Sequence, residues 1–81
     1  MRATVLVRPK AGILDPQGEA VQDSLQKLGF PVRGARIGRI VDLELDTDDP
    51  AAAREQVERM CRELLANPLI ESVEIRMGDE P

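Results

Sequence analysis

The chain has no histidine, no tryptophan and no tyrosine, and it has a single cysteine and a single phenylalanine. Without histidine it lacks the usual general base near neutral pH and the commonest metal ligand in proteins. The lone Cys61 cannot form an intramolecular disulfide, and a free cysteine is typical of a reducing compartment. We therefore expect no catalytic, cofactor-binding or metal-binding residues on this chain.

Long hydrophobic runs are absent as well. No apolar stretch approaches the length of a transmembrane helix, and no basic-then-apolar signal segment opens the sequence, so we expect a cytoplasmic protein without membrane contact.

The net charge is −4, from +4 in residues 1–40 (seven basic, three acidic) and −8 in residues 41–81 (four basic, twelve acidic). An acidic chain whose one aromatic residue makes no platform for stacking bases is also a poor nucleic-acid binder, which disfavours an RNA-binding domain.

Hydrophobic periodicity divides the chain into six elements of one domain spanning residues 1–81. The expected elements are strands at 2–8, 31–37, 40–46 and 69–77 and helices at 15–29 and 49–67, and the tail 78–81 is expected to fray. The order β-α-β-β-α-β predicts an α+β, ferredoxin-like fold, in which two helices cover one face of a four-stranded antiparallel sheet.

The stretch "GILDPQGEAV" at residues 12–21 poses a choice between a phosphate-binding loop and a helix start. Gly12 and Gly18 lie too far apart for a dinucleotide fingerprint, and the lysine of a Walker loop is missing. Asp15 followed by Pro16 is instead a typical N-cap and first helical residue. We interpret the stretch as a capped helix start, which leaves the loop at 10–14 as a possible contact surface.

Three aspartates precede the second helix and resemble a metal cluster: Asp46, Asp48 and Asp49. They lack the glycine and the distal glutamate of a calcium-binding loop. Asp49 is followed by Pro50, which repeats the helix-start pair of the first helix. Helix capping is therefore the favoured interpretation of this cluster.

Both helices carry an apolar stripe. Its members are Val21, Leu25 and Leu28 in the first helix, and Ala53, Val57, Met60, Cys61, Leu64 and Leu65 in the second. Their spacing predicts that both stripes pack on the sheet. We therefore expect Cys61 to be a buried structural thiol, since free cysteine is among the most buried residue types. Gly29 is the expected left-handed end of the first helix.

Gly38-Arg39 fits a type II′ hairpin turn, which pairs Arg33 with Glu44 and Ala35 with Asp42. On the sheet face that the helices leave open, aliphatic side chains lie among charged ones. They are Leu6, Ala35, Ile37, Ile40 and Ile70. A mixed patch of this kind predicts self-association into a homodimer or larger assembly.

Three blocks in order carry a family resemblance: "KAGILDPQGEAVQDSLQKLGF" at 10–30, "VRGARIGRIVDLELD" at 32–46 and "MCRELLANPLIESVEI" at 60–75. Together they resemble the PurS family, the small subunits of phosphoribosylformylglycinamidine synthase. The resemblance covers nearly the whole chain, from about Val5 to Ile75. Where the family commonly has a lysine after the glycine of the turn, this chain has Arg39, which keeps the charge.

The resemblance implies a role in purine biosynthesis, in a ligase that converts formylglycinamide ribonucleotide, ATP and glutamine to formylglycinamidine ribonucleotide, ADP, phosphate and glutamate. It implies a non-catalytic subunit that bridges a glutaminase subunit and a large synthetase subunit, and that assists ammonia transfer between them. ATP and Mg would be used by the large partner, not by this chain. Candidate partner-contact residues are Lys10, Gly12, Arg36 and Arg39.

A different class of function stays open from the sequence. Regulatory modules similar to ACT domains have the same element order and place a glycine near the first strand-helix junction, where a small amino acid binds between protomers. Gly12 could fill that position. Saturable binding of a free amino acid would favour this alternative over the bridging subunit.

Overall fold

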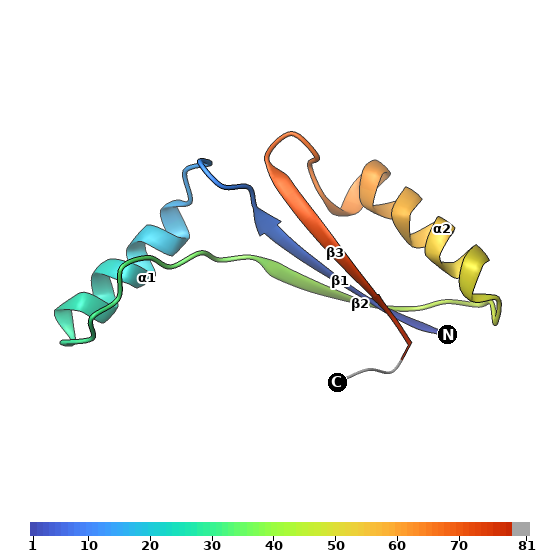
Figure 1. Cartoon of the computed structure of the whole chain (residues 1–81), viewed down its shortest axis with the longest axis horizontal. Coiled ribbons are helices and arrows are strands. Elements are labelled where there is room, and N and C mark those ends of the chain that lie inside the picture. Colours follow the sequence, from blue (N-terminus) through green and yellow to red (C-terminus); the bar gives the residue numbers. More distant parts are fainter. Residues whose placement is uncertain (79–81) are drawn as a thin grey trace.

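The computed structural model describes residues 1–78, so the expected fraying of the tail beyond Gly78 lies outside the described residues. The elements in chain order are β1 (Arg2–Pro9), α1 (Pro16–Lys27), β2 (Arg39–Glu44), α2 (Pro50–Met60), the π-helical turn η1 (Cys61–Leu65) and β3 (Glu71–Met77) (Figure 1). Both helices begin as the sequence predicts, with Asp15 and Asp49 as N-caps followed by proline. The α+β class is confirmed.

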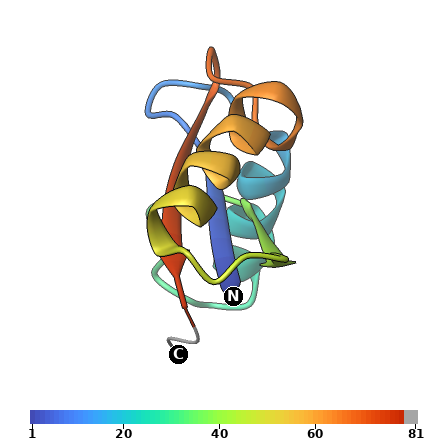
Figure 2. The same ribbon diagram turned by 90° about the vertical axis from the view of Figure 1, so that its right-hand side faces the viewer.

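Within residues 1–78, the sheet has three antiparallel strands in the order β2-β1-β3. Val5, at the centre, lies opposite Val41 on one side and Ile75 on the other. Alternate residues of β1 are fully buried because they face α2, which covers one face of the sheet (Figure 2). The buried core consists of Ala3, Val5, Val7, Val57 and Cys61, with Val41, Leu43, Leu45, Leu65, Ala66, Ile75 and Met77 packed around it.

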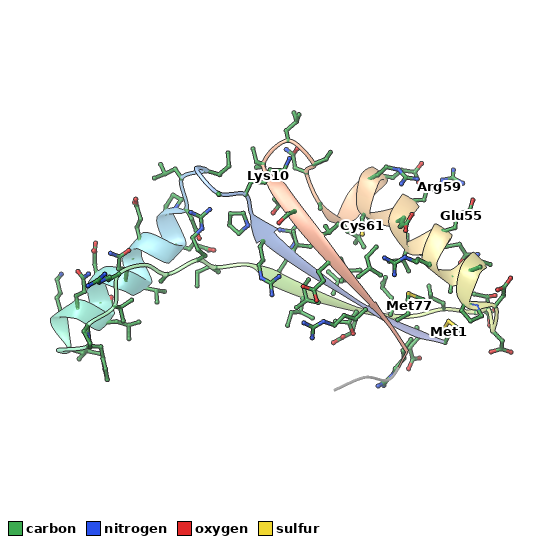
Figure 3. The ribbon with its side chains drawn as sticks, viewed as in Figure 1. Met1, Lys10, Glu55, Arg59, Cys61 and Met77 are labelled. Atoms are coloured by element: carbon green, nitrogen blue, oxygen red, sulfur yellow. The ribbon has the colours of Figure 1, made fainter. Side chains whose placement is uncertain are left out.

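Cys61 is 5% exposed and belongs to this core, which confirms the predicted structural thiol (Figure 3). The apolar stripe of α2 is confirmed at Val57, but the prediction for Leu64 is wrong, since that side chain is 84% exposed. The cause is η1, in which the Ala66 N–H bonds the Cys61 carbonyl five residues earlier. A π-turn adds a residue per turn and so rotates the following side chains. Leu65 packs on the core in its place.

The predicted fourth strand is not formed among the residues that the structure describes. Residues 31–38 are extended but are assigned to no strand, and the chain runs through Gly38 directly into β2 without a hairpin turn (Figure 1). The predicted pairing of Arg33 with Glu44 is therefore absent within the monomer. β2 pairs with β1, and this pairing begins at Arg39, which lies opposite Val7. The residues before Arg39 continue past the end of β1.

Helix α1 does not share the face that α2 covers, so the prediction of two helices on one sheet face is wrong. Figure 1 shows α1 projecting from the opposite end of the molecule, and Figure 2 shows it behind α2. The chain measures 48 × 28 × 14 Å, with a radius of gyration of 15.8 Å. A compact chain of this length has about 12 Å. We call α1 with residues 28–38 the arm.

The arm leaves its apolar side chains exposed. The apolar stripe of α1, which the sequence predicts to pack on the sheet, is exposed to solvent at Val21 (38%) and Leu28 (73%). Phe30, just after the helix, is 55% exposed. Gly29 has a φ of 96° and ends the helix in the left-handed conformation, as predicted. Among residues 1–78, the arm is thus a well-formed helix packed only on its own return segment, with no sheet beneath it.

Candidate functional site

The junction between the arm and the sheet gathers three of the four predicted partner-contact residues. Lys10 and Gly12 lie in the loop that follows β1, and Gly12 has a φ of 86°. Arg36, from the returning segment of the arm, donates from Nη2 to the Lys10 carbonyl at 2.7 Å. Arg39 lies further on, at the start of β2. Their role in partner binding stays a prediction.

Asp15 closes the base of the arm. Its Oδ1 accepts a hydrogen bond from the Gly18 N–H at 3.0 Å, which is the expected N-cap. Its Oδ2 accepts from the Ile37 N–H at 2.8 Å, across 22 residues of sequence. These two backbone donors lower the pKa of Asp15 from its ordinary value, and the Ile37 N–H has the larger effect. Nearby Arg36 lowers the pKa further.

Gly18 allows the return segment to lie against α1. A Cβ at this position would lie 2.3 Å from the Ala35 carbonyl oxygen and 2.6 Å from Asp15 Oδ2. No side chain fits there, and Gly18 is the buried residue of α1. The "LDPQG" block is therefore a capped helix start, as the sequence predicts, and it also fastens residues 35–37 to the helix.

A second contact joins the two outer strands at the same end of the sheet. Arg39 Nη1 donates to Glu71 Oε2 at 2.6 Å and Nη2 to Glu71 Oε1 at 3.1 Å, and Nη2 also donates to the Leu65 carbonyl. Glu71 Oε1 also accepts from the Asn67 N–H at 2.8 Å. The Arg39 guanidinium lowers the pKa of Glu71 most, and the Asn67 N–H lowers it further. Arg39 is thus held within its own chain.

Sequence reasoning missed Glu71 as the partner of Arg39. The signal was present, because Glu71 is the residue that breaks the apolar alternation of the last strand. Glu71 is in register with Val73 and Ile75, on the side of the sheet that α2 covers. A carboxylate on the covered side of a sheet is stabilised by a cation beside it. Here the cation is Arg39, from β2, which lies two strands away from β3.

The five residues predicted to form one apolar face are separated in the monomer. Leu6 and Ile40 lie opposite each other on the uncovered face of the sheet. Ala35 and Ile37 belong to the arm, and Ile70 lies in the turn before β3. Their common role in self-association therefore stays a prediction.

Charged groups occupy much of the uncovered face beside Leu6 and Ile40. Glu74 is the centre of one network, with Arg8 Nη1 at 3.4 Å and Arg76 Nε at 2.7 Å from its carboxylate. Thr4 donates to Asp42 at 3.1 Å across the neighbouring pair of strands. The charged side chains that the sequence places on the open face therefore pair with one another across the strands.

The aspartates before α2 act as the capping interpretation predicts at Asp49. Its Oδ1 accepts from the Ala51 N–H at 3.1 Å, and its own N–H bonds Thr47. Within residues 1–78, no three acidic, cysteine or histidine side chains converge as a metal site would require. Over the same residues, neither helix has the length and apolar character needed to span a bilayer.

Comparison with known proteins places the chain in a family. The family model PurS, described as phosphoribosylformylglycinamidine (FGAM) synthase, matches residues 2–79. The chain belongs to the PurS family. A relative from Synechocystis, the PurS subunit of phosphoribosylformylglycinamidine synthase, is 46% identical over 72 residues, covering 88% of this chain and 70% of the relative.

Solved PurS structures have the same fold. The PurS of Methanocaldococcus jannaschii, one of the subunits of formylglycinamide ribonucleotide amidotransferase, is 37% identical with a TM-score of 0.81, covering 93% of this chain and 92% of that one. A chain in the PurLQS structure from Thermotoga maritima is 33% identical with a TM-score of 0.84, covering 93% of both. The chain is therefore a PurS-type subunit of a purine-biosynthesis ligase, which favours that prediction over the ACT-like alternative.

Proposed function

We propose that this chain is the bridging subunit of phosphoribosylformylglycinamidine synthase. It joins a glutaminase subunit to a large synthetase subunit in the cytoplasm and assists the passage of ammonia from the first to the second. The large partner binds ATP and Mg and carries out the synthesis. The PurLQS structure, which contains a chain of the same fold, supports assembly with the other subunits.

The observation that carries this proposal is the shape of the chain. An 81-residue protein that leaves Leu28, Phe30 and Val21 exposed on a projecting arm gains stability when another chain covers them. Burying one such side chain fully contributes about 1.5–3 kcal/mol. That is a large share of the stability of a small domain. The exposed apolar side chains of the arm therefore favour binding to another chain, as a bridging subunit requires.

We infer that one of these contacts is with a second copy of the chain. The outer edge of β2 has no strand beside it among residues 1–78, and residues 31–38 are extended with no strand partner. If residues 31–37 of one copy add to β2 of the other, each copy completes a four-stranded, ferredoxin-like sheet. The hairpin pairing of Arg33 with Glu44 and Ala35 with Asp42 then forms between chains, as in a domain swap.

The same exchange provides a cover for the arm. When the return segment of one copy lies along the β2 edge of the other, α1 comes with it, because Asp15 and Gly18 fasten the helix to residues 35–37. The apolar stripe of α1 then has a sheet to pack on. Two helices per sheet follow, one from each copy. Leu6, Ala35, Ile37, Ile40 and Ile70 are the proposed self-association residues.

Reconstitution with the two partner subunits from the same genome tests the bridging function. Synthesis of formylglycinamidine ribonucleotide is measured with glutamine and, separately, with ammonium salt as the nitrogen source. We expect the chain to be required with glutamine and to matter much less with ammonia, since free ammonia needs no transfer. Full glutamine-dependent activity of the partner pair without this chain would overturn the bridging role.

A further inference from the structure

The connection between the arm and β2 is held straight at two successive residues, Gly38 and Arg39. Gly38 lies so close to the end of β1 that a Cβ there would clash with the Val7 carbonyl oxygen. Arg39 is the first residue of β2 and lies opposite Val7. Figure 1 shows the chain passing from the arm into β2 without reversing its direction.

The Arg39 side chain fastens the start of β2 to the far side of the sheet. It reaches across the end of β1, because Arg39 and Glu71 belong to the two outer strands and both lie on the face that α2 covers. Hydrogen bonds of 2.6 and 3.1 Å join the guanidinium to both carboxylate oxygens of Glu71, and another goes to the Leu65 carbonyl. Paired bonds between arginine and a carboxylate fix direction as well as distance. We call these three hydrogen bonds the Arg39 clamp.

A hairpin at the same place would break the Arg39 clamp. Gly38-Arg39 fits a type II′ turn, in which the glycine has a positive φ and the second residue reverses the chain. In the structure the φ of Gly38 is not positive, and Arg39 is a strand residue. Turning back here would remove Arg39 from its place opposite Val7 and carry its guanidinium away from Glu71. The clamp is therefore compatible with the extended connection and incompatible with the hairpin.

We propose that the Arg39 clamp is a conformational lock, which holds the connection extended and so directs residues 31–37 to β2 of a second copy instead of β2 of their own chain. The inference rests on the proposed function, in which strand exchange between copies completes each sheet. Each clamp lies within one chain, so both clamps of an exchanged dimer stay intact, whereas a monomer closed by the hairpin has none. A difference of this kind between two states is what shifts the equilibrium between them.

The experiment compares three variants of the full chain with wild type. Glu71→Ala removes the carboxylate of the clamp and leaves the sequence of the connection unchanged. Arg39→Asn removes the guanidinium and supplies a residue that favours a two-residue hairpin after glycine. Glu58→Ala is the matched control, since it breaks the 3.2 Å ion pair with Arg54 within α2 and leaves the connection untouched. Light scattering over a range of chain concentrations gives the dimer dissociation constant, and circular dichroism with denaturant titration follows folding.

We expect wild type and Glu58→Ala to have the same dimer dissociation constant. Glu71→Ala should raise this constant by about tenfold or more, because each dimer loses two clamps and hydrogen bonds between charged groups are among the stronger ones. Arg39→Asn should raise it further, since it also favours the turn. The monomers that form should be folded, because the hairpin supplies the fourth strand within the chain.

A wild-type dissociation constant in both clamp variants overturns the inference. So does dissociation that occurs only together with unfolding, because the clamp would then stabilise the chain without choosing between two folded forms. A wild type that is monomeric at micromolar concentration overturns strand exchange, and this inference with it. Failure of the inference alone is recognised by a dimeric wild type and clamp variants that dimerise equally well.

Discussion

Asp15 Oδ2 accepts the backbone N–H of Ile37 at 2.8 Å, and this contact ties the end of the arm to the start of its helix. The same carboxylate caps α1 through the Gly18 N–H. One side chain therefore begins the helix and ties its return segment to it. The arm behaves as a unit because both of its parts depend on Asp15.

Replacing Asp15 should loosen the base of the arm. Asp15→Asn replaces one of the two accepting oxygens by an NH2 group that cannot accept, whereas Asp15→Ala removes both acceptors. Hydrogen exchange at the Ile37 and Gly18 amides should therefore quicken at one position in the first variant and at both in the second. Unchanged protection of Ile37 in Asp15→Ala would contradict the role of the contact.

The contribution of Asp15 should also depend on pH. Because its pKa in the folded chain is lowered from 3.8, its stabilising effect is present above that value and is lost as the pH falls through the folded pKa. The difference in free energy of unfolding between wild type and Asp15→Asn should therefore be largest near neutral pH and shrink in acid. Denaturant titrations at a series of pH values measure it, and a difference that grows in acid would reverse the sign.

Gly38 should not tolerate a side chain. A Cβ there would lie 2.2 Å from the Val7 carbonyl oxygen, where the chain crosses the end of β1. We expect Gly38→Ala to lower the free energy of unfolding by about 1–3 kcal/mol through forced displacement of backbone. Gly34→Ala is the matched control, since nothing lies within 4 Å of its Cβ position, and it should change stability by less than about 0.5 kcal/mol.

Cys61 should behave as a core residue. Cys61→Ala should lower the free energy of unfolding by about 1–2 kcal/mol through a small cavity, without changing the rate of the assembled enzyme beyond what unfolding explains. Burial raises the pKa of the thiol, which lowers its reactivity near neutral pH. Labelling of the native thiol should accordingly be slow. Rapid modification by a bulky reagent would contradict its burial.

Strand exchange between copies makes a prediction about the connection at Gly38-Arg39. A short glycine insertion there should allow the chain to turn back, so that residues 31–37 pair with β2 of their own chain. The expected product is a folded monomer by light scattering, whereas wild type should be a dimer or larger. An inserted variant with wild-type mass, or a wild type that is monomeric at micromolar concentration, would refute the exchange.

Local features of the chain could be predicted from sequence because they depend on neighbouring residues. The caps at Asp15 and Asp49 follow from the identity of one residue and the proline after it. The left-handed Gly29 and the inward face of β1 follow from conformational freedom and period-2 alternation in the same way. The burial of Cys61 follows from its helical spacing and from the usual burial of free cysteine.

Only the tertiary structure decided where the first helix and the segment after it lie. Alternation shows that residues 31–37 favour an extended conformation, but it carries no information on which strand, or which chain, lies beside them. β1 can pair with only two strands, and β2 and β3 take both edges. The Arg39–Glu71 contact and the Asp15–Ile37 bond join residues 32 and 22 positions apart, and such pairs are set by the path of the chain through space.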